Sequence, residues 1–417
     1  MSHKCRLIVK GGQPLSGTVQ CSGAKNAALP ILAACLMVEG EYVIENVPDL
    51  ADIRIMIRML KSLGVHAEYA QPNLVRISNT RSIKHIAPYE LVTSMRASFF
   101  VAGPLLARTR RAKVPLPGGC AIGARPLDIH LKGFKALGVE VSLEHGFVDL
   151  KAKELKGQPI CLDFPSVGAT ENVMMAACLS DGETVISNAA KEPEIVDLGH
   201  FLIKAGAKIE GLGTATIRIQ GVSSLNGQNY PVMADRIEAG TFLLGAAITK
   251  GDVTVTGIAR EPLEACIQKM EEMGLKIEST ENSIRTTYQN PYQGVDIDTM
   301  PFPGFPTDMQ AQFMAALVLA DGVSVIKETI FENRFMHANE LMRMGADIRL
   351  DSHSAIITGV KQLSGAEVKI TDLRAGAALV LAGCAAKGDT QIYDLHHLER
   401  GYEGFPEKLA SLGAKFG

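Results

Sequence analysis

The stretch Met59–Val65 (MLKSLGV) decides the fold, because the same phrase returns five more times along the 417-residue chain. In each copy a helical pattern runs into a glycine, and an apolar residue and a strand pattern follow. Glycine directly after a helical pattern is typical of a helix C-terminus, since it tolerates the left-handed backbone there. The six pivot glycines, 68 to 74 residues apart, are Gly64, Gly138, Gly206, Gly274, Gly345 and Gly413. This period predicts six copies of one supersecondary repeat.

Two further phrases flank the pivots. In five copies a glycine turn and an alternating strand, as in Gly182–Ile186 (GETVI), begin 23 to 25 residues before the pivot. A third phrase follows the pivot, as in Ile217–Gly227 (IRIQGVSSLNG), and each repeat also contains a more apolar helix such as Val173–Leu179. The repeat therefore contains both strands and helices, which predicts an α/β fold.

The sixth repeat stops at Gly417, without its closing strands. The N-terminal segment Leu7–Gly17 (LIVKGGQPLSG) resembles Ile217–Gly227, so we expect it to complete the last repeat. Both termini would then belong to one domain. The two predicted three-repeat domains are residues 22–232, and residues 1–21 plus 233–417.

Composition excludes several classes of protein. The chain is 47% hydrophobic and 21% charged, with a formal net charge of −3, which is ordinary for a globular protein. It has no general basic field, so nucleic acid and anionic membranes are not expected partners. The longest apolar stretch, residues 27–38, is too short to span a bilayer, and the N-terminus lacks a hydrophobic signal core. We expect a cytoplasmic protein without membrane insertion.

Eight cysteines are present, none spaced as CxxC and none with a histidine at ligand distance, which argues against a zinc site. A disulfide framework is not expected in a reducing compartment. We expect most of these cysteines to be small buried hydrophobic residues. Cys120 is the exception, because it lies in a glycine-rich loop.

The second repeat breaks the pattern at this loop. Its strand-opening turn falls near Arg110, about 28 residues before Gly138, and the extra residues lie in Pro115–Pro126 (PLPGGCAIGARP). A lengthened Gly/Pro-rich loop in one copy of a repeat indicates function, and positive charge nearby favours a thiolate. The neighbouring cations are Arg108, Arg110, Arg111, Lys113 and Arg125. We predict that Cys120 is a reactive thiol; the alternative is an incidental cysteine in a surface loop.

The segment Pro115–His130 (PLPGGCAIGARPLDIH) resembles the catalytic loop of the UDP-N-acetylglucosamine enolpyruvyl transferase family. Eight other motifs resemble that family in its order: Ser22–Leu32, Thr93–Ser98, Ser166–Thr170, Asp235–Phe242, Pro306–Gln312, Glu332–His337, Asp372–Arg374 and Glu399–Tyr402. The resemblance spans residues 6–415. It implies the two-lobed enolpyruvyl transferase fold, which is α/β (α+β) with three βαβαββ repeats per lobe, an inside-out α/β barrel. The catalytic loop 115–126 then belongs to lobe 22–232.

The resemblance also implies a reaction. The enolpyruvyl group of phosphoenolpyruvate is transferred to the 3′-hydroxyl of UDP-N-acetylglucosamine and phosphate is released, the first committed step of peptidoglycan synthesis. These two small molecules are the implied partners, and neither a metal, an organic cofactor nor an obligate protein partner is implied. The epoxide fosfomycin is expected to alkylate Cys120.

Roles for individual residues follow from the same resemblance. Cys120 protonates the methylene carbon of phosphoenolpyruvate or adds to it covalently, and both roles stay open because they need different protonation states. Asp308 takes the proton of the sugar hydroxyl or orients that hydroxyl. The residues implied for binding phosphoenolpyruvate are Lys25, Asn26, Arg125, Arg374 and Arg400, of which Lys25 and Arg400 are also catalytic. Those implied for the nucleotide sugar are Asn26, Arg96, Arg125, Pro126, Leu127, Asp128, Ile129, Ser166, Val167, Gly168, Asp308 and Ile330, with Arg334 and Asp372 in support.

Plainer alternatives exist for these residues. Lys25 could open a solvated helix, and Asp308 after Thr307 could cap the helix that follows. Structural ion pairs are the alternative for the arginines at 334, 374 and 400, and Arg96 could serve structure or closure. One departure is Phe164-Pro165, where some members of the family place a lysine, so contact with the nucleotide there must be apolar or through the backbone.

Three other functions are less consistent with the sequence than enolpyruvyl transfer to UDP-N-acetylglucosamine. Enolpyruvylshikimate phosphate synthase shares the fold and the phosphoenolpyruvate chemistry, but that family lacks the cysteine-bearing loop. A non-catalytic nucleotide-sugar sensor would be expected to have lost Cys120, Lys25 or Asp308, and all three are present. A thiol hydrolase needs a histidine base, and His130 lies ten residues from the cysteine in a helical pattern.

Overall fold

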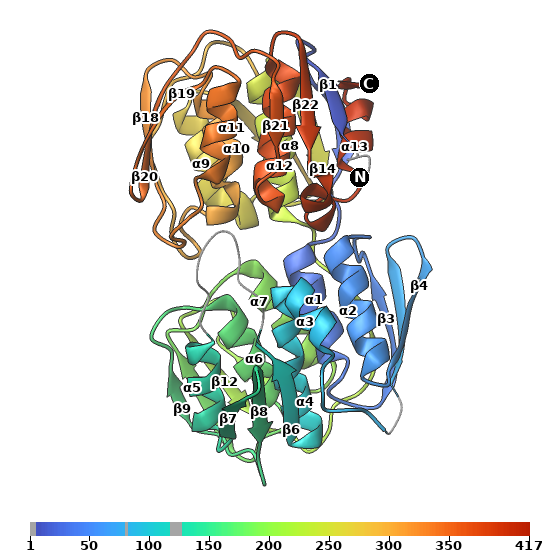
Figure 1. Ribbon diagram of the computed structural model, residues 1–417. Helices are drawn as coiled ribbons and strands as arrows, with labels where there is room; N and C mark the ends of the chain where they lie inside the picture. The colour runs from blue at the N-terminus through green and yellow to red at the C-terminus, as the bar shows by residue number, and fades with distance from the viewer. Residues whose placement is uncertain (1–5, 80–81, 117–126) are drawn as a thin grey trace. The chain divides into compact units, whose positions relative to one another are not determined.

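The computed structural model describes residues 6–79, 82–116 and 127–417, without the side chains of Ser94 and Arg96. Cys120, Arg125 and Pro126 therefore lie outside the described residues. The described chain forms two compact units (Figure 1). The terminal unit comprises residues 6–22 and 234–417, and the central unit comprises residues 23–79, 82–116 and 127–233. That these units are two separate three-repeat domains stays a prediction.

Three helices form the core of the terminal unit: α8 (Arg236–Thr249), α10 (Gln310–Leu317) and α12 (Leu373–Ala385). They contact one another, and every residue of α8 and α10 is buried, as expected of helices that are apolar all round. Three more amphipathic helices end at pivot glycines: α9 (Glu264–Glu272), α11 (Met336–Arg343) and α13 (Phe405–Ser411).

Three four-stranded sheets surround these helices (Figure 1). The first has the order β15 (Lys276–Ser279), β16 (Ser283–Thr287), β14 (Asp252–Thr256), β2 (Ser16–Gln20). The second has the order β17 (Ile297–Asp298), β18 (Val323–Lys327), β20 (Ser354–Thr358), β19 (Asp347–Asp351). The third has the order β21 (Glu367–Lys369), β22 (Asp389–Tyr393), β1 (Leu7–Lys10), β23 (Lys415–Phe416). In each sheet one edge strand is parallel to its neighbour and the other pairs are antiparallel.

The N-terminal strand completes the last repeat, as the sequence predicts. Strand β1 pairs antiparallel with β22, with Leu7 opposite Ile392, and also with β23 at the end of the chain, with Val9 opposite Phe416. Without β1 the third sheet would lose the strand that joins its two halves.

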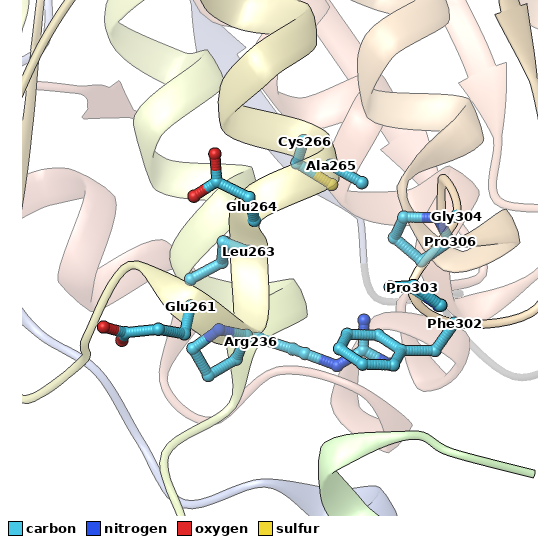
Figure 2. Close-up of a pocket in the computed structure, with 11 residues that line it drawn as sticks. Arg236, Glu261, Leu263, Glu264, Ala265, Cys266, Phe302, Pro303, Gly304 and Pro306 are labelled. Carbon is cyan, nitrogen blue, oxygen red and sulfur yellow. The ribbon is translucent and has the colours of Figure 1, made fainter. Parts of the chain in front are cut away.

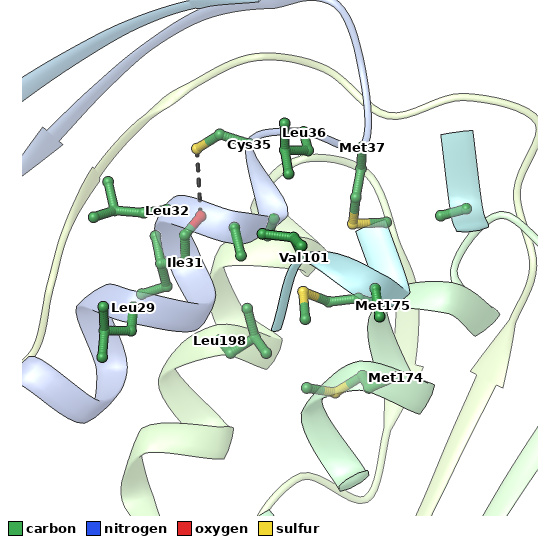
Figure 3. Packing of buried hydrophobic residues seen from close by; sticks show 14 of the residues in the cluster. Leu29, Ile31, Leu32, Cys35, Leu36, Met37, Val101, Met174, Met175 and Leu198 are labelled. Atoms are coloured by element: carbon green, nitrogen blue, oxygen red, sulfur yellow. Dashed lines mark hydrogen bonds between the residues drawn. The ribbon is translucent and has the colours of Figure 1, made fainter. Parts of the chain in front are cut away.

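The central unit repeats this plan. Its inner helices are α1 (Lys25–Ala34), α4 (Ala102–Thr109) and α6 (Val167–Ala177), and the 3₁₀-helix η1 (Arg96–Val101) leads into α4. The other helices are α2 (Ala51–Ser62), α3 (Tyr89–Ser94), α5 (Asp128–Ala136) and α7 (Pro193–Lys204). Figure 3 shows Leu29 and Ile31 of α1 packed with Met174 and Met175 of α6 and with Leu198 of α7. Within the described ranges no helix has both the length and the apolar run that crossing a membrane requires.

One sheet of the central unit departs from the predicted repeat. Two sheets have four strands, in the orders β13 (Asn229–Pro231), β3 (Gly40–Glu45), β5 (Leu74–Asn79), β4 (His66–Gln71) and β11 (Lys208–Glu210), β12 (Thr216–Gln220), β10 (Glu183–Ser187), β9 (Pro159–Cys161). The third has three, in the order β6 (Arg111–Pro115), β8 (Phe147–Lys151), β7 (Glu140–Glu144). A single parallel bridge between Ile86 and Lys113 stands in place of its fourth strand. Pro88, two residues on, has no amide hydrogen with which to extend the pairing.

The pivot glycines have the predicted role. All six have left-handed backbones, with φ between 88° and 112°. At the first of them the amide of Gly64 bonds the carbonyl of Lys61, and the amide of Val65 bonds that of Leu60. The same pair of bonds closes the other five helices, which makes each a Schellman C-cap. The C-cap prediction is therefore confirmed in every copy.

Gly274 offers a clean test of this role, because a Cβ there would meet open space and the left-handed φ of 91° is the only obstacle. We expect Gly274→Ala to lower the free energy of unfolding by about 1 kcal/mol. Gly274→Asn should cost less, because asparagine tolerates this backbone. Urea unfolding of the three proteins measures both effects, and equal stability of wild type and Gly274→Ala would contradict the C-cap assignment.

Candidate active site

Four of the predicted site residues stand at or just before the N-terminal ends of inner helices. In the central unit Lys25 opens α1 and Ser166 caps α6. In the terminal unit Asp308 lies in the 3₁₀-helix η3 (Thr307–Met309) directly before α10, and Asp372 caps α12. The first amides of a helix have no partner inside it and carry the positive end of the helix dipole. These ends therefore suit anionic ligands.

Two arginines hold the carboxylate of Asp308. Arg334 donates from Nη2 to Oδ1 at 2.7 Å, and Nε and Nη2 of Arg374 lie 3.2 and 3.1 Å from Oδ2. The two arginine side chains are 6% and 2% exposed, whereas that of Asp308 is 28% exposed. The carboxylate is thus fixed from the protein side and open on another. Within the described residues this carboxylate bonds the two arginines, and Met309 at the N-cap of α10 makes no side-chain cap bond.

Arg374 is a permanent cation beside this carboxylate. Its guanidinium lies 5.2 Å from the centre of the Tyr402 ring, and Gln312 donates to the Tyr402 hydroxyl at 2.9 Å. Burial by itself would lower the pKa of Arg374, but Asp308 and Tyr402 outweigh it and the pKa is raised. Asp372 fixes the start of the same helix by accepting from the amides of Arg374 and Ala375 at 2.8 and 3.0 Å.

Lys25 is buried rather than solvated, which excludes the plainer alternative for it. Its Nζ lies 3.3 Å from Oδ2 of Asp52 in the first turn of α2, and the two side chains are 7% and 3% exposed. Buried charges of this kind persist only when they are paired. The sequence analysis missed Asp52; its signal is a carboxylate on the buried face of an amphipathic helix.

Helices α5 and α6 bring two predicted nucleotide-sugar segments together. Leu127–Ile129 stands at the start of α5, and Ser166–Gly168 at the start of α6. A Cβ on Gly168 would lie 3.1 Å from Cε1 of His130 and 3.3 Å from the Phe100 ring. Glycine at this position therefore lets the two helix ends approach each other.

A buried amide that sequence reasoning missed, Asn172, fixes this arrangement. Its Oδ1 accepts from the amide of Gly103 at 2.8 Å. Its Nδ2 donates to the carbonyl of Phe99 at 3.3 Å and lies 3.2 Å from Nδ1 of His130. Asn172 thus joins η1, α4 and α5 to α6. The only signal in the sequence is a polar residue within an apolar helix.

The remaining predicted residues differ in their surroundings. Asn26 and Asp128 are exposed, and Ile330 and Arg400 are half-buried, the latter at the end of η4 (Leu395–Arg400). Phe164, in the Phe164-Pro165 pair where some members of the family place a lysine, is 44% exposed. Cys120, Arg125, Pro126 and the side chain of Arg96 lie outside the described residues, so their placement stays a prediction.

Most of the other cysteines are packing residues, as predicted. Five are buried, and they are Cys21, Cys35, Cys178, Cys266 and Cys384. Burial raises the pKa of Cys178 to about 12, so this thiol is not a thiolate at neutral pH. Cys161 is exposed.

A small pocket in the terminal unit lies apart from the predicted residues. Figure 2 shows it between the start of α9 and Phe302–Pro306, with the Arg236 guanidinium beside the Phe302 ring, 5.7 Å from its centre. None of the predicted site residues lines it. Among the described residues no group of three or more His, Cys, Asp or Glu side chains is arranged to hold a metal ion.

The chain is similar to proteins that are named as carboxyvinyl or enolpyruvyl transferases. The EPSP synthase (3-phosphoshikimate 1-carboxyvinyltransferase) family matches residues 9–409. UDP-N-acetylglucosamine 1-carboxyvinyltransferase 1 of Caldanaerobacter subterraneus subsp. tengcongensis is 54% identical over 99% of both chains. UDP-N-acetylglucosamine 1-carboxyvinyltransferase 2 of Carboxydothermus hydrogenoformans is 53% identical over 98% of both. The crystal structure of the enolpyruvyl transferase NikO from Streptomyces tendae superposes with a TM-score of 0.90 at 25% identity, covering 99% of each chain.

Glu171, just beyond the start of α6, yields a test of the electrostatics here. Its carboxyl is fully buried, and neither oxygen has a hydrogen-bond partner within the part of the chain described. Burial raises its pKa well above the ordinary value of 4.5, and Glu194 and Glu192 raise it further. The folded state therefore keeps a proton that the unfolded chain releases above pH 4.5. The stability that Glu171 contributes is complete below that pH and is lost as the pH rises.

We expect Glu171→Gln, which keeps the shape of the neutral acid, to be more stable than wild type at pH 8. At pH 4 the two proteins should differ little, because the glutamate is largely protonated in both states. Urea unfolding across this range measures the difference. A difference that does not change with pH would contradict the buried neutral acid.

Proposed function

Because the chain belongs to the UDP-N-acetylglucosamine 1-carboxyvinyltransferase family, we propose that it transfers the enolpyruvyl group of phosphoenolpyruvate to the 3′-hydroxyl of UDP-N-acetylglucosamine. Phosphate is the second product. The observation that carries the proposal is the 54% identity to a relative of that name along 99% of both chains. The reaction belongs to peptidoglycan synthesis in the cytoplasm, and thereby to cell-wall growth, cell shape and division.

The chemistry is an addition followed by an elimination. The sugar hydroxyl gives up its proton as its oxygen forms a bond to C2 of phosphoenolpyruvate. The methylene carbon C3 takes a proton, which gives a tetrahedral ketal that carries the phosphate. Loss of a proton from C3 and of phosphate from C2 then restores the double bond. The protein must supply a proton donor at C3, a group that takes the hydroxyl proton or orients the hydroxyl, and cations for the phosphate and carboxylate.

Asp308 would take the proton of the sugar hydroxyl or orient that hydroxyl. Two arginines hold its carboxylate in one place, one on each oxygen. Orientation of this kind can supply a large part of a rate enhancement. Arg334 and Asp372 act through Asp308 and Arg374 and are supporting residues.

Four cations and one amide side chain would bind phosphoenolpyruvate, whose phosphate and carboxylate are both anionic. The residues proposed for this are Lys25, Asn26, Arg125, Arg374 and Arg400. Lys25 and Arg374 are each buried beside one carboxylate, so a dianion arriving there meets positive charge that is already desolvated.

The nucleotide sugar would lie along the starts of α5 and α6. The amides at the start of α6 suit an oxygen of the diphosphate, and exposed Phe164 suits an apolar contact with the nucleotide. The proposed binding residues are Asn26, Arg96, Arg125, Pro126, Leu127, Asp128, Ile129, Ser166, Val167, Gly168, Asp308 and Ile330. The proposal includes no metal and no organic cofactor.

The second candidate is 3-phosphoshikimate carboxyvinyl transfer, which the description of the matching family names. Two observations favour the nucleotide sugar as acceptor. The relatives at 53% and 54% identity are both named for it, and the loop Pro115–Pro126 carries the cysteine that the shikimate enzymes lack.

Replacing the proposed proton donor tests the assignment. With phosphoenolpyruvate and UDP-N-acetylglucosamine, Cys120→Ala should release phosphate at least about a hundredfold more slowly than wild type, the usual scale of acid catalysis. Cys161→Ala, which removes an exposed cysteine, is the matched control and should keep its activity. A wild type that is inactive with this acceptor but turns over shikimate 3-phosphate would refute the proposal.

Reactivity of the same thiol can be read from mass alone. We expect fosfomycin to add once to wild type and to Cys161→Ala, and not to Cys120→Ala, because a thiolate opens the epoxide. Intact-mass spectrometry after incubation measures the adduct. An unchanged wild-type mass would contradict a reactive Cys120.

A further inference from the structure

Glu328, directly after β18, is a buried carboxylate that accepts four hydrogen bonds. Its Oε1 accepts from the Thr299 hydroxyl at 2.9 Å and from the amides of Ile330 and Phe331 at 2.9 and 3.2 Å. Its Oε2 accepts from the Thr307 hydroxyl at 2.8 Å. The residue is 2% exposed. A buried carboxylate with this many donors is fixed in position by its surroundings.

One of these bonds leads to the carboxylate proposed to direct the sugar hydroxyl. The Thr307 hydroxyl donates its hydrogen to Glu328, so its oxygen can only accept from Arg334. Nη1 of Arg334 donates to that oxygen at 2.7 Å. The other terminal nitrogen of the same guanidinium donates to Asp308 at 2.7 Å. Glu328, Thr307, Arg334 and Asp308 therefore form one continuous chain of hydrogen bonds.

The other oxygen of Glu328 orders the segment that carries Ile330, a predicted sugar contact. The amides of Ile330 and Phe331 both point at Oε1, and the Phe331 ring lies 5.1 Å from the Arg334 guanidinium. The Glu328 carboxylate thus contacts both the backbone at Ile330 and the Thr307 hydroxyl that bonds Arg334. It therefore fixes the position of the Ile330 segment relative to Arg334.

We propose that Glu328 is a positioning residue for the acceptor sugar. It fixes the position of Asp308 through Thr307 and Arg334, and it fixes the Ile330 segment through the backbone amides of that segment. The sugar is thereby held in register with Asp308. The proposal rests on the proposed function. Only a carboxylate meets all four donors. In Glu328→Gln, if the amide oxygen stays on the Ile330 side, the new NH₂ group faces Thr307, whose hydroxyl then loses its acceptor while two donors compete for its oxygen.

The experiment is steady-state phosphate release with both substrates varied, on wild type, Glu328→Gln, Thr307→Val, the double variant and Thr299→Val. For Glu328→Gln we expect kcat to fall about tenfold to a hundredfold, the scale of a misplaced catalytic group, and the KM for UDP-N-acetylglucosamine to rise while that for phosphoenolpyruvate changes little. Thr307→Val should lower kcat as well, and the double variant should be no slower than the slower single one, because both changes break the same chain.

Thr299→Val is the matched control for the link from Thr307 to Arg334. It removes a bond to Glu328 and the acceptor of the Thr329 amide but leaves that link in place. It should keep kcat near wild type. Exposed Glu281→Gln controls for loss of charge. If Glu328→Gln fails to fold, the contrast between Thr307→Val and Thr299→Val decides alone.

Three results would overturn the proposal: equal losses in Thr299→Val and Thr307→Val, additive losses in the double variant, or a Glu328→Gln enzyme with unchanged kcat. In each of these cases the activity of wild type with UDP-N-acetylglucosamine leaves the proposed function standing. An inactive wild type would overturn both.

Discussion

The burial of the inner helices on every side is the constraint on which the rest of this structure depends. A helix buried all round leaves unbonded amides at one end and unbonded carbonyls at the other, and each end must find partners. In the central unit two arginines serve the carbonyl ends: Arg110 donates to the carbonyls of Leu106 and Leu179, and Arg108 to that of Leu36. The amide ends are left to small caps such as Ser166 and to ligands. Sites for anions therefore follow from the way the core is built.

Charge around Asp308 illustrates how such an end becomes a site. Two guanidiniums, on side chains that are 6% and 2% exposed, hold one carboxylate whose own side chain is 28% exposed. Guanidiniums and free helix amides at such an end suit an anionic ligand. Arg374 also packs on Tyr402, which shows that its position is fixed by packing as well as by charge.

The repeat could be predicted from the sequence because its signals are local. A Schellman cap such as that at Gly64 involves residues no more than five apart, so the pattern that specifies it lies within one short phrase. The completion of the last sheet by Leu7–Lys10 could also be predicted from the sequence. The segment that contains this strand resembles the sequence that follows the pivot glycine in other repeats and is missing after Gly413. The three-stranded sheet of β6, β7 and β8 could not be predicted. A strand pattern in the sequence does not show that the pairing of Ile86 with Lys113 stops after one bridge.

By itself, then, the sequence determined the repeats, the helix ends and the chemical types at the site, since periodicity and capping act over a few residues. Only the tertiary structure decided which charges meet. Lys25 and Asp52 are 27 positions apart, and Arg334 and Arg374 reach Asp308 from 26 and 66 positions away. Such pairs depend on how separate helices pack, and no short stretch of sequence records that choice. The same reason explains why the sequence does not predict the roles of Glu328 and Asn172. Both residues bond groups that are distant in the chain.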